Sequence, residues 1–455
     1  MTTWAGADGP VSHAMREVIV VGGGLAGLAT AAALGGAGYS VHLFETRAFL
    51  GGRATSYPYI AAGEPAETID NCQHILLRCC VNLLDFYERL GVADRIDFQK
   101  EFYFIEPGGR MSVFKAGVLP PPLHFSGSFL RLTYLSLADK IAVARGMLAI
   151  RSEYHKRKDL DQITMLQWLQ EKRQTPGAIE RFWRQVLVSA INEELDQMAA
   201  LHGFQVFWLG FLAQSNSYEM GIPAVPLGSL YAPEMWERLP GVRLHLRAPV
   251  ERVTENNGSV CGVIVGGEKF QADAYVMAVP FERIEALVPG LDLDLTPFSH
   301  SPITGIHLWF DRSITDLPHA TVLDRTIQWV YNKGGGRYLQ LVVSASRSLI
   351  DMPRADVIAL ALKELAEFFP AVKEAKLEKA HVVKEVRATF SAQPGLEALR
   401  PGTKTEIGNL FLAGDWTRSG WPATMEGAVR SGYIAAEAVA AAAGSPRKFL
   451  LPDIA

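Results

Sequence analysis

Three glycines near the start of the chain have the spacing of a phosphate-binding turn. Gly22-x-Gly24-x-x-Gly27 follows the apolar run 18–21 and opens the Ala/Leu-rich run 25–34. In such a turn the first glycine allows a tight bend, the second lets the backbone approach a pyrophosphate, and the third allows a helix to pack closely on a strand. The free N–H groups at a helix start bind phosphate oxygens. This spacing therefore predicts a dinucleotide site.

Charged side chains that suit the rest of a dinucleotide follow the second apolar run, 41–44. Glu45 ends that run, where its carboxylate can accept hydrogen bonds from a ribose hydroxyl and disfavours a 2′-phosphate. The strand-helix-strand pattern alone leaves both NAD and FAD open. Gly51-Gly52-Arg53 bears on the choice, because small residues give room and an arginine can reach a phosphate.

A second group of such residues lies near the other end of the chain. Residues 410–415 read Leu-Phe-Leu-Ala-Gly-Asp, a short apolar strand followed by Gly414 and Asp415. An Ala-rich helix begins at Thr424, Met425 and Glu426. The N-terminus of a helix stabilises negative charge, so a helix starting here favours an anionic group.

The elements that must position these residues predict an α/β fold with two lobes. Strand patterns at 18–21, 41–44, 242–279 and 410–412 predict one Rossmann-like parallel-sheet domain, with Asn257-Gly258 as a hairpin turn. A β region at 303–343 and the mostly helical sequence before it predict a mixed-sheet and helical substrate domain. The predicted order is a leader (1–15), the first segment of the cofactor domain (16–80), a helical substrate or lid region (81–240), the second segment of the cofactor domain (241–290), a substrate-domain sheet (291–395), the third segment of the cofactor domain (396–445) and a tail (446–455).

Composition and charge exclude several classes of function. Lys+Arg 44 against Asp+Glu 48 gives a net charge of -4, which argues against nucleic acid as a partner. Four cysteines, two of them adjacent, make a poor disulfide framework, and no apolar run has the length of a membrane span. We therefore expect a cytoplasmic protein. No signature of a metal hydrolase, a serine-triad esterase or an NTPase is present, and we expect no metal.

The chain after residue 15 resembles the FAD-dependent amine oxidases and phytoene desaturases, on Gly22–Gly27, Glu45, Gly51–Arg53, Gly414-Asp415 and the helix start at Thr424. The resemblance implies FAD as the cofactor and places Asp415 near its ribityl and pyrophosphate groups. It places the helix start near the flavin pyrimidine edge, where negative charge collects on reduction. The implied cofactor-binding residues are Gly22, Gly24, Leu25, Ala26, Gly27, Glu45, Arg47, Gly52, Arg53, Val250, Gly414, Asp415, Thr424, Met425 and Glu426.

Within that family the chain looks most like the squalene-associated branch, which contains hydroxysqualene dehydroxylases. The residues concerned are 69–74, 83–87, 414–417 and 421–424, with Cys72 where that branch usually has glycine. The resemblance implies that reduced FAD converts hydroxysqualene to squalene and water, a step in hopanoid supply. The electron donor that reduces FAD is not identified by the sequence.

That reaction needs a proton donor and a long apolar pocket. His74, with Asp70 near it, is the candidate acid, and a structural role in holding its loop is an equal alternative. The apolar stretches 119–137 and 204–212 suit an isoprenoid tunnel, with core packing as the alternative. The predicted substrate-binding residues are Phe207, Trp208, Phe211 and Trp309. The basic segment 151–158 is a candidate for peripheral contact with the inner face of a membrane, against a solvated helix face or loop.

Three other functions stay open. A carotenoid desaturase such as one acting on phytoene would use the same flavin and tunnel in the oxidative direction. A flavin amine oxidase often carries a lysine on the strand 303–310, where this chain has Thr304. Rab escort and GDP dissociation inhibitor proteins resemble the fold and bind prenylated partners without redox chemistry, but the Arg53 and Asp415 motifs argue against that function.

Overall fold

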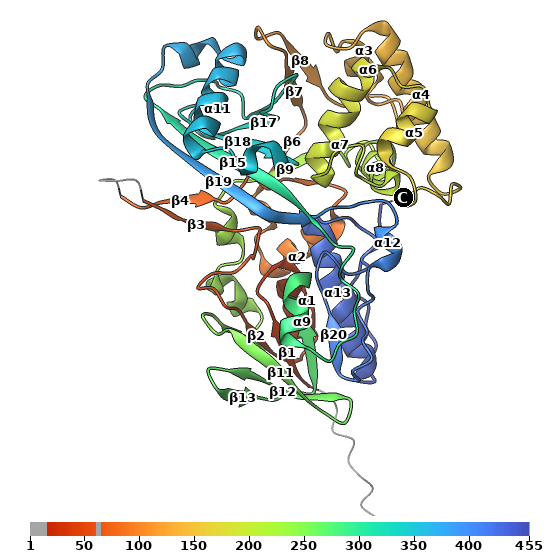
Figure 1. Cartoon of the computed structure of the whole chain (residues 1–455), viewed down its shortest axis with the longest axis vertical. Helices are drawn as coiled ribbons and strands as arrows, with labels where there is room; N and C mark the ends of the chain where they lie inside the picture. Colours follow the sequence, from red (N-terminus) through yellow and green to blue (C-terminus); the bar gives the residue numbers. More distant parts are fainter. Residues whose placement is uncertain (1–15, 61–64, 455) are drawn as a thin grey trace, which may run out of the picture.

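The computed structural model describes residues 16–60 and 65–454, so the predicted leader lies outside the described residues. A five-stranded parallel sheet occupies one end of the molecule, in the order β10-β2-β1-β14-β20 (Figure 1). Its strands come from three segments far apart in the chain. They are β1 (Glu17–Val21), β2 (Ser40–Phe44), β10 (Val242–His245), β14 (Ala274–Met277) and β20 (Leu410–Leu412).

Small residues allow the helices to lie close to this sheet and to each other. The sheet packs with α1 (Leu25–Gly36) and α13 (Met425–Ala442), and α2 (Val81–Leu90) packs against both of these helices. The short helix α9 (Ile284–Leu287) contacts a strand at residues 250–256. A Cβ on Gly27 would lie 2.0 Å from the Gly22 carbonyl oxygen, and one on Gly432 would lie 2.3 Å from the Ala26 carbonyl oxygen. Gly27 therefore has the helix-on-strand packing role that the spacing predicts.

An antiparallel sheet lies beside the parallel one and consists of β11 (Val250–Asn256), β12 (Ser259–Val265) and β13 (Glu268–Phe270). The predicted hairpin turn is present: Asn257 and Gly258 have φ of 49° and 74° between β11 and β12. Two positive φ angles in a two-residue loop match the twist of the flanking strands.

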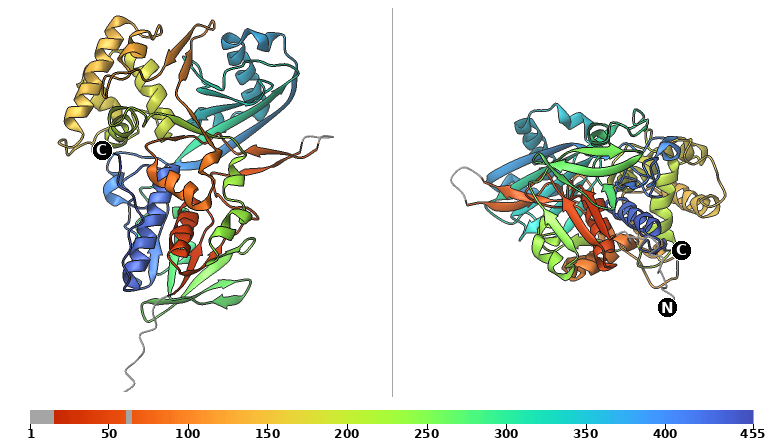
Figure 2. Two further views of the ribbon diagram at one scale, coloured as in Figure 1. Left: turned by 180° about the vertical axis from the view of Figure 1, so that it is seen from behind. Right: turned by 90° about the horizontal axis from the view of Figure 1, so that it is seen from below.

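A seven-stranded mixed sheet forms much of the other lobe (Figures 1 and 2). Helix α11 (Arg354–Phe368) buries Val357, Ala361, Leu365 and Phe368, which recur at helical spacing on one face. A short helix, α10 (Arg347–Ile350), precedes it. The sheet order is β19 (Leu377–Phe390), β15 (His300–Phe310), β18 (Tyr338–Ser344), β17 (Trp329–Gly334), β16 (His319–Val322), β7 (Phe102–Ile105) and β8 (Met111–Phe114).

Residues 81–240 are less purely helical than predicted, because they also supply strands. β7 and β8 join the seven-stranded sheet through a parallel pairing of β7 with β16. A small antiparallel sheet has β9 (Met220–Pro223) at its centre, paired with β5 (Leu76–Leu77) on one side and β6 (Ile96–Gln99) on the other. β3 (Ser56–Tyr59) pairs with β4 (Glu67–Asp70). The remaining helices are α3 (Ser126–Leu130), α4 (Leu137–Glu153), α5 (Met165–Glu171), α6 (Pro176–Ala178), α7 (Arg184–Ile191), α8 (Ala200–Phe207) and α12 (Leu396–Leu399).

No helix within residues 16–60 and 65–454 is both long enough and apolar enough to cross a bilayer. The core is continuous between the helical group and the sheets: one cluster of buried side chains joins Trp168, Trp183 and Phe207 to Trp329 and Trp416. Two cavities lie between these layers.

Candidate functional site

A cavity of about 2110 Å³, counting the solvent at its mouth, opens at the carboxyl ends of the parallel strands. We call it the sheet-end cavity. Gly22 follows β1, Glu45 follows β2, Ala278 follows β14 and Gly414 lies just after β20, and all four residues line it. Open α/β sheets bind ligands at this edge, because successive strand ends gather their loops there.

The start of α1 supplies unpaired backbone donors to this cavity. Gly24 is the N-cap residue of α1, and no side chain caps the helix. A Cβ built on Gly24 would meet no atom within 4 Å, so the space in front of the backbone is open. Gly24, Leu25 and Ala26 all line the cavity. A helix N-terminus with free N–H groups and an open approach fits a pyrophosphate.

Glu45 lies beside this turn. Its carboxylate accepts a hydrogen bond from the Gly23 N–H at 2.7 Å and another from the Arg47 N–H at 2.8 Å. The Arg47 guanidinium donates to the Gly52 carbonyl at 3.2 Å. Glu45, Arg47, Gly52 and Val250 line the sheet-end cavity together, so the structure brings these sequence-predicted residues to one wall.

Arg53 and Asp415 form an ion pair of 2.6 Å on the cavity wall. Burial works against the charge of Arg53, but Asp415, with Glu282 and Glu385 further off, outweighs burial and raises the pKa of Arg53. Arg53 also donates to the Ala388 carbonyl at 2.9 Å. A permanently charged guanidinium held in this way can bind a phosphate or an electron-rich ring.

Sequence patterns did not identify Arg400, whose guanidinium bonds the backbone of Asp415. Arg400 is 1% exposed and donates to the Asp415 carbonyl at 2.8 Å and to the Trp421 carbonyl at 2.7 Å. It thereby fixes the loop that joins β20 to α13. An arginine beside Pro401 and Gly402 in a loop gives no local signal of such burial, so the sequence could not single it out.

The start of α13 divides its three predicted residues between different surroundings. Thr424 is the N-cap residue and accepts from the Gly427 N–H at 3.0 Å, and both Thr424 and Met425 line the sheet-end cavity. Glu426 does not line it. The Glu426 carboxylate instead accepts from the Leu83 N–H at 2.7 Å and the Asn82 amide at 2.9 Å, at the start of α2.

Burial raises the pKa of Glu426 to about 7, although the hydrogen bonds from Asn82 and Leu83 and the charge of Arg430 pull it down. The side chain is 1% exposed. A helix start favours a carboxylate through its free N–H groups. Glu426 thus acts as a packing contact that joins α13 to α2, and it does not reach the wall of the sheet-end cavity.

His74 and Asp70 have separate surroundings. His74 lines the sheet-end cavity, and its Nδ1 donates to the Cys72 carbonyl at 3.0 Å. Burial lowers the pKa of His74, while the Cys72 carbonyl and Asp70 act in the opposite direction. Neutral His74 therefore carries its proton on Nδ1, and Nε2 is an acceptor.

Asp70 is buried and fully engaged. Its carboxylate accepts from the Ser56 hydroxyl at 2.6 Å, the Leu227 N–H at 2.8 Å and the Lys333 ammonium at 3.2 Å. Asp70 does not line the sheet-end cavity, in contrast to residues 71–75. Its contacts anchor β4 beneath the loop that carries His74.

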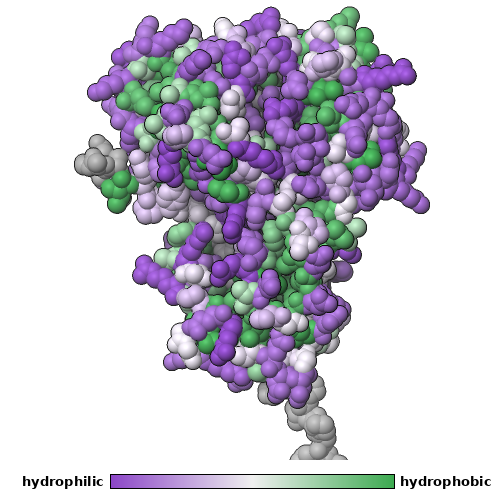
Figure 3. Space-filling view, in the orientation of Figure 1, coloured by the Kyte–Doolittle hydropathy of each residue, from purple (hydrophilic) through white to green (hydrophobic). Residues whose placement is uncertain are grey.

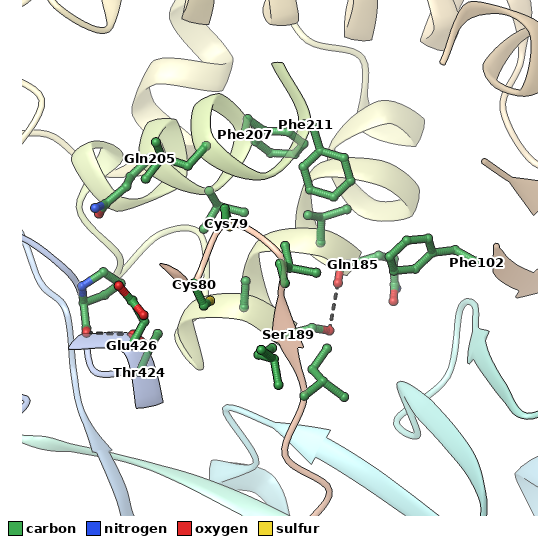
Figure 4. A pocket seen from close by; sticks show the side chains of 18 of the residues that line it. Cys79, Cys80, Phe102, Gln185, Ser189, Gln205, Phe207, Phe211, Thr424 and Glu426 are labelled. Carbon is green, nitrogen blue, oxygen red and sulfur yellow. Dashed lines mark hydrogen bonds between the residues drawn. The ribbon is translucent and has the colours of Figure 1, made fainter. Parts of the chain in front are cut away.

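A second cavity, which we call the apolar cavity, encloses about 1320 Å³, again counting the solvent at its mouth (Figure 4). Its only charged side chain is Glu426, and aromatic and aliphatic side chains cover most of the wall. Phe207 and Phe211 line it, whereas Trp208 and Trp309 do not. Trp208 packs on Tyr154 with ring centroids 5.6 Å apart, and Trp309 stacks on Tyr338 at 4.4 Å.

The two cavities share some of their walls. The residues common to both are Ile75, Ser189, Ala190, Trp329, Thr424 and Met425. A planar group in the sheet-end cavity would therefore have one edge or face against the space enclosed by aromatic side chains. No group of three His, Cys, Asp or Glu side chains suited to a metal ion occurs among the residues that the structure describes.

A protein-family model described as flavin-containing amine oxidoreductase matches residues 25–440. Similar curated proteins include a probable zeta-carotene desaturase and a 15-cis-phytoene desaturase, both from Synechococcus elongatus. Each is 27% identical and covers 93% of this chain, with 98% and 96% of the relative covered. A 15-cis-phytoene desaturase of an Oncidium hybrid cultivar is 29% identical over 93% of this chain and 77% of its own length.

Solved structures agree on the fold. An oxidoreductase from Methanosarcina mazei superposes with a TM-score of 0.69 at 17% identity, covering 92% of this chain and 99% of its own. A putrescine oxidase bound to putrescine superposes with a TM-score of 0.65 at 18% identity, covering 94% and 99%. The two-lobed α/β architecture with mixed sheets is therefore the architecture of flavin-dependent oxidoreductases.

Proposed function

Because the chain belongs to the flavin-containing amine oxidoreductase family, we propose that this FAD-dependent oxidoreductase acts on a long isoprenoid chain held in the apolar cavity. The observation that supports this most directly is the shared wall of the two cavities. A substrate in the apolar cavity would contact the cofactor across Ile75, Ser189 and Trp329. A charged amine would have few partners in the apolar cavity, because Glu426 is the only acidic side chain among the described residues that line it.

The residues of the sheet-end cavity fit FAD. The N–H groups of Gly24 to Ala26 would bind the pyrophosphate, Glu45 the ribose, and the Arg53–Asp415 pair the region between pyrophosphate and flavin ring. The start of α13, at Thr424 and Met425, would face the pyrimidine edge and favour negative charge there. When bound, FAD supplies hydride donation or acceptance at its N5 atom.

Two reactions fit this arrangement. The named relatives favour desaturation of a carotenoid precursor, in which the isoprenoid loses a hydride and a proton and FAD is reduced. The motifs at 69–74, 83–87, 414–417 and 421–424 favour a different reaction with hydride transfer in the opposite sense, the reductive dehydroxylation of hydroxysqualene. In that reaction the substrate hydroxyl would take up a proton and leave as water as the C–O bond breaks, and hydride from reduced FAD would form the new C–H bond.

His74 is our candidate for proton transfer in either direction. Neutral His74 has a free acceptor at Nε2, because Nδ1 donates to the Cys72 carbonyl. This state suits removal of a proton during desaturation. Dehydroxylation requires His74 to be protonated first, and burial opposes that. Asp70 is proposed only to anchor β4 under the His74 loop, since its oxygens already have three partners.

We also propose a peripheral membrane contact, at a place other than the basic segment. Arg157 of that segment is engaged by Glu153, Asp159 and Glu171. Large apolar side chains are exposed nearby instead, at Val118, Leu119, Leu123, Leu130, Leu137, Ile141 and Leu148. These residues lie in or beside α3 and α4, at the upper right in Figure 1. Figure 3 shows the molecule in the same orientation, with hydrophobic residues among hydrophilic ones in that region.

The α3 end of this exposed apolar surface adjoins the apolar cavity. Phe125, the N-cap residue of α3, stacks on the cavity residue Phe114 with ring centroids 4.5 Å apart, and its ring lies 5.9 Å from the ring of Phe211. A long isoprenoid dissolves in a bilayer and not in water. A surface that enters the headgroup region beside the cavity would let such a substrate pass without crossing water.

One experiment decides between the two reactions. FAD-loaded protein is reduced anaerobically with dithionite and given hydroxysqualene, and in parallel the oxidised protein is given phytoene with a quinone acceptor; lipid products are identified by mass. Squalene with flavin reoxidation supports dehydroxylation, and new conjugated double bonds support desaturation. If neither lipid is altered or bound, the isoprenoid function is wrong.

A further inference from the structure

Trp329 is the only aromatic side chain among the described residues that line both cavities. It lies in β17, where its ring stacks beside that of Tyr331 with centroids 5.7 Å apart and planes 10° from parallel. Trp329 is 8% exposed, whereas its cross-strand partner Thr321 is 1% exposed. The indole therefore keeps accessible surface at the junction of the two cavities.

Hydrogen bonds fix the edge of this indole. The Trp329 Nε1–H donates to the Ser189 hydroxyl at 2.7 Å, and that hydroxyl donates to the Gln185 carbonyl at 2.8 Å (Figure 4). The Phe102 ring packs edge-on with its centroid 6.5 Å away. Because α7 occupies the N–H edge, the group that the indole can offer a ligand is its π face.

The other residues of the junction are poor partners for a positive charge. None of them is charged, and only Ser189 and Thr424 carry a hydroxyl group. Both hydroxyls are engaged, since Thr424 caps α13 and donates to the Pro422 carbonyl at 3.3 Å. Met425 adds a thioether, which is a weak acceptor. The ring of Trp329 is therefore the main electron-rich group on this wall.

The surroundings of Trp329 hold no competing cation. No lysine, arginine or histidine lines the apolar cavity among the residues that the structure describes. His319 lies 6.1 Å from Trp329 between ring centroids, but burial lowers the pKa of His319 to about 4, so its ring is neutral near pH 7. In the sheet-end cavity, Arg53 is already paired with Asp415.

Both reactions considered above make one substrate carbon positively charged. In desaturation a C–H bond would break, its two electrons would leave with the hydride that oxidised FAD accepts, and the cation would then lose a proton from the next carbon. In dehydroxylation a protonated hydroxyl would leave as water with the C–O electron pair, and the cation would gain hydride from reduced FAD. Either way the charged carbon touches the cofactor, and so lies beside the wall that the cavities share.

We propose that the π face of Trp329 stabilises the positive charge that develops on the substrate carbon during hydride transfer. This proposal rests on the isoprenoid function and adds a catalytic residue to it. Among aromatic side chains the face of tryptophan attracts a cation most strongly, and the attraction grows where water is excluded. Ser189 is then a positioning residue, because its hydroxyl holds the edge of the indole.

The test compares two ligands of the same shape and different charge. One is an isoprenoid chain of squalene length with a dimethylammonium nitrogen near its middle, and the other has a gem-dimethyl carbon at that position. Binding to FAD-loaded protein is followed by the change in flavin absorbance at pH 5, where Glu426 is uncharged because its pKa is about 7. The ratio of the two dissociation constants separates the charge of the ligand from its packing.

Trp329→Leu should weaken binding of the ammonium ligand relative to the neutral one by about twofold to thirtyfold, the range of a cation–π contact. Trp329→Phe keeps a smaller π face and should lose less. Fluorinated tryptophans placed at position 329 keep the shape of the indole and withdraw π charge, so the relative affinity for the ammonium ligand should fall with each added fluorine, and turnover in the same order. These proteins keep the test open if Trp329→Leu does not load FAD.

Trp421→Leu is the matched control. Trp421 lines the apolar cavity but not the sheet-end cavity, and the Arg430 guanidinium already lies 5.7 Å from the centre of its ring. This variant should change both affinities by the same factor. If the ratio keeps its wild-type value in Trp329→Leu and in the fluorinated proteins, Trp329 only packs, whereas binding of the neutral chain still supports the isoprenoid function. If wild type binds neither chain, the isoprenoid function and the role of Trp329 fail together.

Discussion

Arg53 and Asp415, which are 362 positions apart in the chain, meet as an ion pair of 2.6 Å on the wall of the sheet-end cavity. Arg53 follows the glycine turn after β2, and Asp415 follows β20 at the far end of the chain. Parallel strands bring both loops to the same edge of the sheet. The pair therefore joins the first and last segments of the domain at the sheet-end cavity, which is our proposed FAD site.

Asp415→Asn should weaken FAD binding. The substitution leaves the Arg53 guanidinium without its carboxylate. Loss of one charged hydrogen bond at a partly exposed arginine corresponds to about 1 to 3 kcal/mol, or about fivefold to 150-fold in the dissociation constant. Titration of apoprotein with FAD measures it. Asp85→Asn, which removes an ion pair of 2.7 Å with Arg89 away from both cavities, is the control and should leave FAD affinity unchanged. Wild-type affinity in Asp415→Asn would contradict the role of the pair.

Deprotonation of Glu426 should lower the free energy of unfolding as pH rises. Its pKa in the folded protein is about 7, raised by burial from the ordinary 4.5, so the folded state binds the proton more tightly than the unfolded chain. The contribution is fully present below pH 4.5 and is lost as pH rises through about 7, amounting to about 3 kcal/mol. The urea midpoint of wild type relative to Glu426→Gln should therefore fall between pH 5 and pH 8.

A second carboxylate on α13 provides the control for this pH effect. Burial tends to raise the pKa of Glu437, but Lys448 and the N–H groups of Leu450 and Phe449 outweigh burial and lower it. Its contribution is present above the ordinary pKa and is lost as pH falls, so Glu437→Gln should show the opposite sign. A pH-independent difference between wild type and Glu426→Gln would show that Glu426 keeps an ordinary pKa.

His74→Gln should lower turnover while leaving FAD content normal. Proton transfer by a positioned side chain contributes about a hundredfold to ten-thousandfold, and the Nδ1 bond to the Cys72 carbonyl is a local contact away from the pyrophosphate cradle. The pH profile separates the directions. A proton acceptor loses rate as pH falls below 6.5 through its lowered pKa, whereas an acid gains rate there. Full turnover in His74→Gln at every pH would end both roles.

Local sequence patterns correctly predicted the parts of the site that depend on backbone geometry. The glycine spacing predicts the turn after β1, because Gly22 and Gly27 leave no room for a Cβ. The sequence did not predict which of the neighbouring residues at the start of α13 would face the sheet-end cavity. Met425 and Glu426 are neighbours, but successive helical residues point about 100° apart, so Met425 lines the sheet-end cavity and Glu426 contacts α2.

The same geometry explains which predicted substrate residues reach the apolar cavity. Phe207 and Phe211 are four residues apart and share a face, whereas Trp208 is turned toward Tyr154. Trp309 has the same parity along β15 as Ile303, which lines the sheet-end cavity, but it lies about 20 Å further along the strand. Distances along an element and pairings such as β7 with β16 depend on the assembled fold, and sequence patterns do not give them.

The exposed apolar residues of α4 should drive binding to membranes. Leu137, Ile141 and Leu148 are 71%, 51% and 62% exposed and fall within about 40° of one another around the helix axis, so they form one apolar stripe. Burying a leucine side chain contributes about 1.5 to 3 kcal/mol. Replacing all three by serine should abolish flotation with vesicles, at low and at physiological salt alike, because salt hardly screens apolar insertion.

Lys156→Ala with Lys158→Ala is the comparison for an electrostatic contact and should weaken flotation only with anionic vesicles at low salt. A wild-type protein that floats with neither zwitterionic nor anionic vesicles would show that this stripe serves another purpose.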